Sequence, residues 1–183
     1  MEELKTERLR LIPFDLSHTE MVHQMSVDPE VRRYLWEGKI IPVQQIEDMV
    51  NDSCDCFSQH GSGFFAMFVN LASDPHNGAF VGFCGHRVFD SGQDNADADD
   101  QIELLFAMQP RFWGRGYGQE AARAVLRHGF EACGFERVIA ATDTPNQRSV
   151  NVLQSLGMSF MQRREWRGLD TVFYQLSATE FDV

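Results

Sequence analysis

Hydrophobic positions along the chain follow two periods, one typical of strands and one typical of helices. Alternating or continuous apolar residues predict strands over residues 4–13, 64–71, 79–89, 101–109, 137–142, 160–166 and 171–176. Apolar residues spaced by three and four predict helices that begin near Ser17 and Pro29, and helices over 44–59, 117–133 and 149–155. This mixture predicts an α/β protein with a mixed sheet.

Polar segments separate several of these elements. Turn-forming residues at 73–78 and 167–170 each separate two strands, so we expect two antiparallel hairpins there. Residues 90–100 are rich in aspartate and predict a solvated loop. This loop lacks the central glycine and the glutamate at its twelfth position that an EF-hand calcium site requires.

Residues 109–121 read Gln-Pro-Arg-Phe-Trp-Gly-Arg-Gly-Tyr-Gly-Gln-Glu-Ala and lie between a predicted strand and a predicted helix. Gly114, Gly116 and Gly118 have no Cβ, so the backbone here can adopt positive φ and a ligand can approach it closely. The turn leads into a helix N-terminus, where unpaired N–H groups and the positive end of the helix dipole favour an anion. The segment therefore predicts a phosphate or pyrophosphate site.

Three kinds of phosphate-binding turn differ in the residues they need. A P-loop requires Lys-Ser or Lys-Thr after its glycines, and a dinucleotide fingerprint requires a third glycine where this chain has Gln119. The third kind is the pyrophosphate loop of acyl-CoA-dependent N-acyltransferases. The segment resembles motif A of the GNAT superfamily, and more closely its RimJ/RimL-like branch of ribosomal-protein N-terminal acetyltransferases. The residues in register with that branch are Glu103, Pro110, Trp113, Gly114, Gly116, Tyr117, Glu120 and Ala121.

Two frames fit the loop pattern [QR]-x-x-G-x-[GA] of the superfamily. One frame starts at Trp113 and uses Gly116 and Gly118, with tryptophan in place of glutamine or arginine. The other frame starts at Arg111 and uses Gly114 and Gly116. The phrase Thr-Glu-Arg-Leu-Arg-Leu at residues 6–11 resembles the opening of the branch, and residues 146–158 resemble motif B. The resemblance implies the GNAT fold, a central mixed and splayed β-sheet flanked by helices.

Length and composition limit the class of protein. The 183 residues fit one domain spanning residues 1–183, and 43% hydrophobic residues suit a globular protein. No apolar run approaches the roughly 20 residues that span a bilayer, and the acidic N-terminus lacks a signal-peptide pattern. We therefore expect a cytoplasmic protein without a membrane partner.

Charge and cysteine content limit its ligands. The net charge of −11 argues against nucleic acid, which binds clustered lysine and arginine, and suits a cationic acceptor such as an amine. The four cysteines lack the spacing of a zinc site, so we expect reduced thiols and no metal.

The resemblance implies which residues bind acetyl-CoA. The loop supplies N–H donors to the pyrophosphate, the backbone of residues 106–108 pairs with the pantetheine arm, and the N–H of Met108 reaches the thioester oxygen. Asn146 matches an asparagine that bonds pantetheine, although capping the next helix is an equally natural role. The cofactor-binding residues implied are Phe106, Ala107, Met108, Trp113, Gly114, Arg115, Gly116, Tyr117, Gly118 and Asn146.

Glu103 lies in an otherwise apolar run, where a charge requires a partner or a use. It is either a solvated carboxylate beside the acidic loop or a general base that accepts the proton of the amine. Deprotonating an α-amine of pKa 7.7–8.0 at pH 7 requires about 1 kcal/mol, whereas a lysine amine requires about 4.6 kcal/mol. One modest base therefore suits an N-terminal amine or a small amine with a perturbed pKa better than an ordinary lysine.

The remaining candidates are weaker. Leu153 stands where many superfamily members carry a tyrosine general acid, which leaves Ser149 or water to protonate the thiolate. Tyr34 and Trp36 lie where the first helices of the family cover the acceptor site, and each has a packing alternative. His86 either lines the substrate cleft or is a hydrogen-bonded strand histidine.

These residues lead to one hypothesis and its alternatives. We expect an acetyl-CoA-dependent N-acetyltransferase that acts by direct attack of a primary amine, by resemblance the N-terminal amine of a ribosomal protein. A small-molecule amine (a polyamine, amino acid or antibiotic) is the alternative acceptor. An acyl-CoA-binding module without turnover and a nicotinamide oxidoreductase are the rival classes. The protein is expected to be a monomer or a homodimer.

Overall fold

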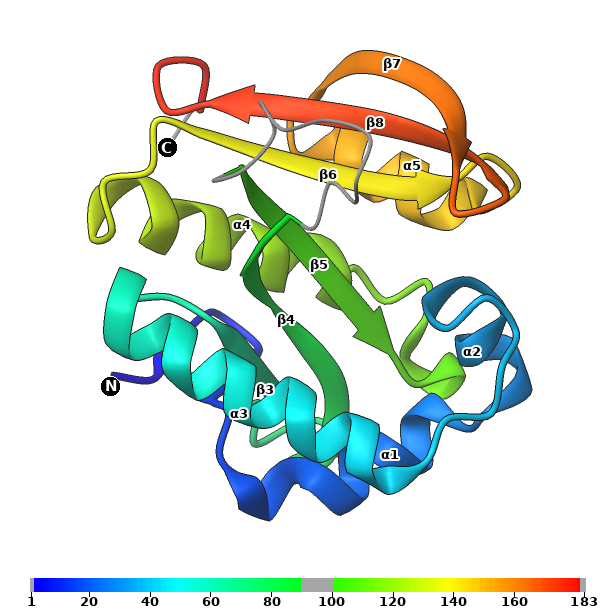
Figure 1. The fold of residues 1–183 in the computed structure, drawn as a ribbon. Coiled ribbons are helices and arrows are strands. Elements are labelled where there is room, and N and C mark those ends of the chain that lie inside the picture. The colour runs from blue at the N-terminus through cyan, green and yellow to red at the C-terminus, as the bar shows by residue number, and fades with distance from the viewer. Residues whose placement is uncertain (1, 90–100, 182–183) are drawn as a thin grey trace.

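A computed structural model describes residues 2–89 and 101–181 and shows one mixed sheet with strand order β1-β2-β3-β4-β5-β6-β8-β7 (Figure 1). The predicted acidic loop at 90–100 lies outside the described residues. The strands are β1 (Leu4–Lys5), β2 (Leu9–Pro13), β3 (Phe64–Val69), β4 (Phe80–Val88), β5 (Ile102–Met108), β6 (Arg137–Asp143), β7 (Ser159–Trp166) and β8 (Leu169–Ser177). The helices are α1 (Thr19–Ser26), α2 (Pro29–Leu35), α3 (Val43–His60), α4 (Tyr117–Glu131) and α5 (Gln147–Ser155).

The prediction of one strand over residues 4–13 was wrong. The chain turns back after β1, so that β1 and β2 pair antiparallel with Leu4 opposite Leu11. Thr6 makes this turn: its N–H donates to the carbonyl of Leu9 over 3.0 Å, and its hydroxyl oxygen accepts from the N–H of Leu9 over 2.9 Å. A threonine side chain that bonds the backbone in this way competes with a continuous strand.

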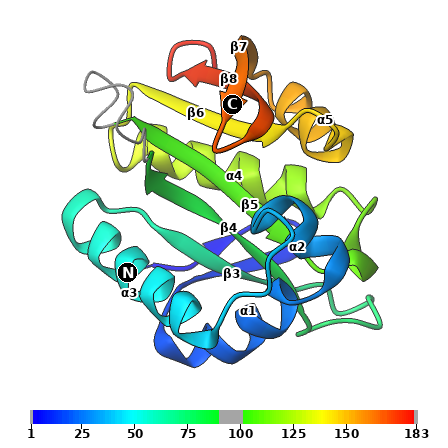
Figure 2. The same ribbon diagram turned by 45° about the vertical axis from the view of Figure 1, so that its right-hand side comes forward.

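Helices cover both faces of the sheet, as expected. Figure 2 shows α3 and α4 on opposite sides of the strands. The face under α1, α2 and α3 is filled by Phe14, Val22, Met25, Val31, Ile46, Val50, Phe64, Ala66 and Phe83. The face under α4 and α5 is filled by Leu9, Leu11, Phe65, Met67, Leu104, Tyr117, Ala121, Val125, Leu126 and Leu153. The two predicted hairpins, β3–β4 and β7–β8, are both antiparallel.

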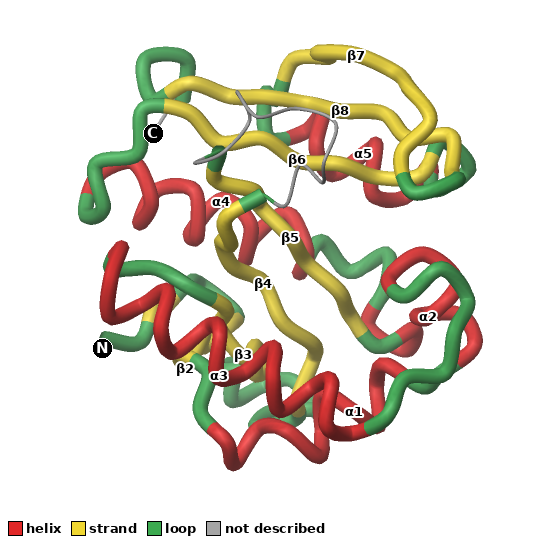
Figure 3. The backbone as a smooth tube through the Cα atoms, in the orientation of Figure 1, coloured by secondary structure: helices red, strands yellow, loops and turns green. Residues whose placement is uncertain are grey.

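The sheet opens between its two parallel strands. β5 and β6 pair only near their starts, Ile102 with Val138 and Glu103 with Ile139, and then diverge (Figure 3). On its other edge β5 pairs with β4 along its whole length, from Ile102 to Met108. Residues 104–108 of β5 therefore present a free backbone edge to the opening, which is the splayed sheet that the resemblance implies.

The described residues hold no helix long and apolar enough to cross a membrane. Within the same residues, no three histidine, cysteine, aspartate or glutamate side chains gather in a way that could hold a metal ion. The four cysteines are free thiols.

Candidate functional site

The opening between β5 and β6 leads into a cavity of about 870 Å3, bounded by α2, by the glycine turn and by the start of α5. Most of the residues singled out from the sequence meet there. Those that line the cavity are Tyr34, Glu103, Phe106, Ala107, Met108, Trp113, Gly114, Gly116, Tyr117, Gly118, Asn146 and Ser149.

The free edge of β5 offers backbone donors to this cavity. The N–H of Gln109 donates to the carbonyl of Val81 on β4 over 2.9 Å. Because successive residues of a strand point their backbone groups to opposite edges, the N–H groups of Met108 and Phe106 face the opening. The carbonyl of Met108 accepts the indole N–H of Trp113 over 2.9 Å. The edge therefore keeps two N–H donors available and has one of its carbonyls occupied.

The glycine turn has the geometry that its sequence requires. Gly114 and Gly116 have φ of 73° and 79°, in the left-handed region that favours glycine. Gly116 is the N-cap of α4 and makes no side-chain capping bond to the N–H groups of the first turn. Gly118 lies inside the helix. The two turning glycines are thus those of the frame that starts at Arg111, and the N–H groups at the positive end of α4 border the cavity.

Two candidate residues beside the turn differ in where they lie. Trp113 lines the cavity, and the guanidinium of Arg148 lies 4.5 Å from the centre of its ring. Arg115 is exposed and is not among the lining residues; its carbonyl accepts a hydrogen bond from Arg8 over 3.0 Å. The side chain of Arg148 therefore brings a positive charge to the cavity that the sequence motifs did not indicate.

Glu103 is buried at the base of the opening, with 3% of its surface exposed. Its carboxylate accepts from Nε of Arg87 over 2.6 Å, and both side chains line the cavity. Leu105, two residues along β5, packs with the core under α1, α2 and α3, so Glu103 lies on that face of the sheet. Glu103 is therefore not the solvated carboxylate that was one of its two expected roles. It belongs to a buried ion pair, because a charge at a buried position requires a partner.

Asn146 and Ser149 meet at the start of α5. The Asn146 side chain accepts from the N–H of Ser149 over 3.3 Å, and its amide nitrogen donates to the Ser149 hydroxyl oxygen over 2.9 Å. Asn146 is therefore the N-cap of α5, one of the two roles expected for it. Leu153, at the position where a tyrosine is common, is buried in the core.

His86 is not brought to the cavity. It is 1% exposed, its Nδ1 lies 2.8 Å from the Ser62 hydroxyl, and its ring packs edge-on against Phe135 with centroids 5.3 Å apart. Burial, and to a lesser extent the neighbouring His128, together lower the pKa of His86 to about 3. Of the two roles expected for His86, the structure therefore supports the hydrogen-bonded strand histidine and not the residue that lines the substrate cleft.

Trp36 borders a second, smaller compartment of about 400 Å3 on the α3 side of β5. Its lining combines apolar side chains with charged and polar ones, among them Leu35, Ile41, Met49, Phe64, Phe83 and Leu105 on the one hand and Glu37, Lys39, Gln45, Arg87 and Arg167 on the other. Leu35, Glu37, Arg87, Leu105 and Arg167 line both this compartment and the main cavity. The two spaces are therefore neighbours, and Arg87, the partner of Glu103, borders both.

Several charged residues of the site carried no recognisable motif. Arg87 lies opposite Glu103 only in the β4–β5 register. Asp143, at the end of β6, lines the cavity; burial raises its pKa, and the nearby Glu37 carboxylate raises it further. A charged residue at the end of an apolar strand was the one signal available for Asp143.

Comparison with known proteins identifies the family. The family description "Acetyltransferase (GNAT) domain" matches residues 8–159. An uncharacterised N-acetyltransferase p20 of Bacillus licheniformis is 26% identical over 187 residues, covering 99% of both chains. The FsC-acetyl coenzyme A-N(2)-transacetylase of Aspergillus fumigatus is 28% identical over 87% of this chain and 66% of that protein.

A solved structure described as RimL, a ribosomal L7/L12 alpha-N-protein acetyltransferase in complex with coenzyme A, superimposes with a TM-score of 0.76. It is 14% identical, and the match covers 96% of this chain and 98% of that one, so it supports the fold. The enzymes of this family use acetyl-CoA and acetylate an amine. The match over most of the chain and the cavity at the splayed strands agree: the chain belongs to the GNAT family and is an N-acetyltransferase.

Proposed function

We propose that the protein transfers the acetyl group of acetyl-CoA to the N-terminal α-amine of a protein, of which a ribosomal protein is the first candidate. The observation that carries the proposal is the position of Glu103. This buried carboxylate lies at the base of the cavity, on the strand whose free edge presents the N–H groups of Phe106 and Met108. A base and two amide donors on one strand suit direct transfer from a bound thioester to an amine.

The glycine turn and the free edge would hold acetyl-CoA. The N–H groups of residues 114–118 suit the pyrophosphate, because they lie at a helix N-terminus without a capping side chain. The N–H of Phe106 suits the pantetheine arm, and the N–H of Met108 suits the thioester oxygen. Acetyl-CoA supplies the activated acetyl group. The chain holds that group in place and keeps it beside Glu103.

Glu103 would take the proton from the attacking amine, either directly or through a water molecule. Arg87 compensates its charge in the buried position and leaves the second carboxylate oxygen unengaged by that contact. A base of this kind suits an α-amine, which needs about 1 kcal/mol for deprotonation at pH 7, better than a lysine amine, which needs about 4.6 kcal/mol.

Ser149 would pass its hydroxyl proton to the thiolate that leaves and take a proton from water in its place. Its oxygen accepts from the Asn146 side chain, so its own hydroxyl hydrogen is the group left to donate. Water is the alternative donor, because a thiol with a pKa near 8.5 is a tolerable leaving group near neutrality. The acceptor would enter beside Tyr34, which lines the main cavity, and Trp36, which borders the second compartment.

A small-molecule amine is the second candidate acceptor. The second compartment has several apolar side chains in its lining and is bordered by Arg87, the partner of Glu103, so it could receive the body of a small amine. Glu37, which lines both spaces, and Asp143 in the main cavity would favour its positive charge.

Thiol release from acetyl-CoA tests the proposal. The panel contains peptides of one sequence with a free or an acetylated N-terminus, a peptide with an internal lysine, a polyamine, an amino acid and an aminoglycoside. We expect release with the free N-terminus and none with its acetylated partner. Faster release with a small amine than with every free peptide would transfer the assignment to the second candidate. Coenzyme A binding without release for any acceptor would instead indicate a binding module.

A further inference from the structure

Arg8, which lies between β1 and β2, supports the glycine turn together with its partner Glu120. Glu120, in the first turn of α4, accepts hydrogen bonds from the Thr6 hydroxyl over 2.5 Å, from the Arg8 N–H over 2.8 Å and from Nε of Arg8 over 2.7 Å. Nη2 of Arg8 lies 2.7 Å from Oε2, the same carboxylate oxygen that accepts from Nε. Glu120 therefore binds Arg8 through two guanidinium nitrogens and fixes the plane of that guanidinium.

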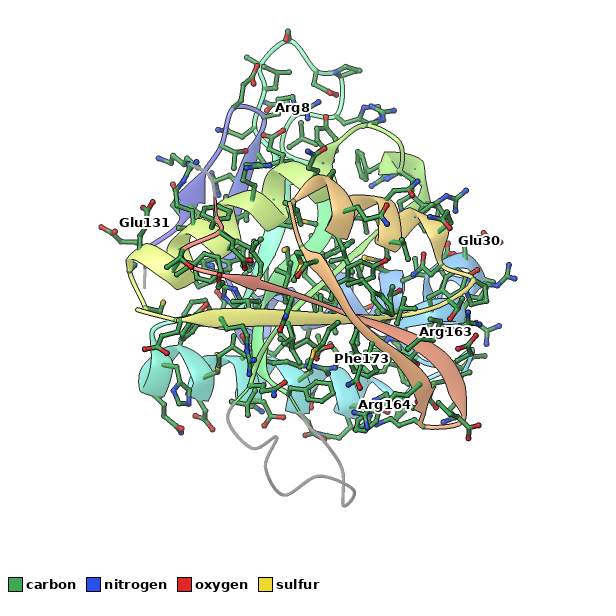
Figure 4. All side chains as sticks on the ribbon, turned by 90° about the horizontal axis from the view of Figure 1, so that it is seen from above. Arg8, Glu30, Glu131, Arg163, Arg164 and Phe173 are labelled. Atoms are coloured by element: carbon green, nitrogen blue, oxygen red, sulfur yellow. The ribbon has the colours of Figure 1, made fainter. Side chains whose placement is uncertain are left out.

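The third guanidinium nitrogen of Arg8 contacts the turn itself. Nη1 donates to the carbonyl of Arg115 over 3.0 Å, and the guanidinium lies 4.9 Å from the centre of the Tyr117 ring. Figure 4 shows Arg8 on the side of the molecule where the first strands approach α4. One side chain thus contacts the turn, the first residue of the helix and the acidic residue one turn later.

The bond to Arg115 determines where the next amide points. The C=O of Arg115 and the N–H of Gly116 belong to one planar trans peptide and point in opposite directions. Because Arg8 holds the carbonyl at the back of the turn, the N–H of Gly116 is directed away from Arg8. Gly116 lines the cavity, and an N–H directed away from Arg8 is the donor that we infer for an anion in that space. A glycine with φ of 79° would otherwise have many conformations open to it.

Tyr117 is anchored on its far side as well. Its hydroxyl donates to Asp74 over 3.0 Å, and Asp74 accepts from the N–H of His76 over 2.8 Å within the turn between β3 and β4. The ring beneath the Arg8 guanidinium is therefore fixed at both ends. The support of the glycine turn comes from two segments far from it in sequence.

We propose that Arg8 is a positioning residue for the pyrophosphate site, acting through the peptide between Arg115 and Gly116 and not through its charge. The inference rests on the proposed use of the glycine turn by acetyl-CoA. Glu120 neutralises the guanidinium, so its long-range attraction for a phosphate is small. The planar set of donors on the guanidinium is then the property that matters. Lysine keeps the positive charge but cannot reproduce this set of donors.

Variants at Arg8 separate geometry from charge. We expect Arg8→Lys and Arg8→Ala each to raise the Kd for coenzyme A, measured by calorimetry, by about tenfold, the scale of one lost charge-assisted hydrogen bond. Glu120→Gln is expected to weaken binding in the same direction. Arg10→Lys is the matched control, because Arg10 lies only two residues further along the chain, on β2, and pairs with Glu3, with Nε 3.2 Å from the carboxylate. Its Kd should equal that of the unmodified protein.

A thioester without the nucleotide distinguishes a role in pyrophosphate binding from a general role in stability, because a general loss of structure would affect both thioesters equally. S-acetylpantetheine has no pyrophosphate, so its kcat/KM should change less than about twofold in the Arg8 variants while the KM for acetyl-CoA rises about tenfold. Equal losses with both thioesters, or unchanged coenzyme A affinity in Arg8→Lys, would overturn the proposal. Should Arg8→Ala not fold, the Lys and Gln variants decide it. Failure of the unmodified protein to bind coenzyme A would instead overturn the proposed function.

Discussion

Two glycines with nearly the same backbone conformation allow a matched test of the turn. Gly114 has φ of 73° and Gly134, beyond the end of α4, has φ of 72°, and a Cβ added to either would meet nothing within 4 Å. Alanine at either position therefore introduces the same left-handed strain of about 1–2 kcal/mol without a steric clash inside the protein. The two substitutions differ only in their distance from the proposed pyrophosphate site.

The expected outcomes follow from where that strain acts. For Gly134→Ala the free energy of unfolding falls by about 1–2 kcal/mol and the Kd for coenzyme A stays unchanged. For Gly114→Ala the turn relaxes in the free protein, and binding must restore the strained conformation, so the Kd rises by about 5- to 30-fold. Calorimetric titration with coenzyme A and denaturant unfolding measure the two quantities. Equal coenzyme A affinity in the two variants would refute the reasoning that the ligand uses this turn.

Two further predictions concern Glu103 and His86. Glu103→Gln should lower kcat at pH 7 at least about tenfold, and the deficit should shrink above pH 8, where an α-amine is already deprotonated; a pH-independent deficit in the rate profile would argue against a base. Because burial holds the pKa of His86 at about 3 in the folded protein against 6.5 when unfolded, the unfolded state binds the extra proton as pH falls. Stability is therefore complete above pH 6.5 and is lost toward pH 3, with about 2 kcal/mol lost between pH 7 and pH 5 from this group. The free energy of unfolding of His86→Gln, measured from unfolding curves at several pH values, should lack this part of the pH dependence. The same pH dependence in the variant and the unmodified protein would contradict the assignment.

The local part of the fold could be predicted from the sequence because short-range rules determine it. The apolar run before the glycine turn, the glycines and the following helix specify β5, the bend and α4 in succession. Asn146 was recognisable as a cap because its partner Ser149 is three residues away. The break after β1 was missed because the Thr6 hydroxyl competes with a strand that the alternating pattern favours.

Contacts between distant segments could not be predicted in the same way. The pairing of Glu103 with Arg87 depends on the β4–β5 register, and that of Glu120 with Arg8 joins residues 112 positions apart. His86 illustrates the same limit: strand alternation shows that a side chain lies on one face, but not which face borders the cavity. Its burial follows from the packing of Phe135 and Gly129 against it.

Titration of the protein with coenzyme A, followed by amide hydrogen exchange of the complex, tests the central claim most directly. We predict saturable binding, with new protection confined to the amides of residues 114–118 at the glycine turn and of Phe106 and Met108 on the free edge of β5. Absence of binding, or protection that appears only on segments away from this opening, would contradict the account.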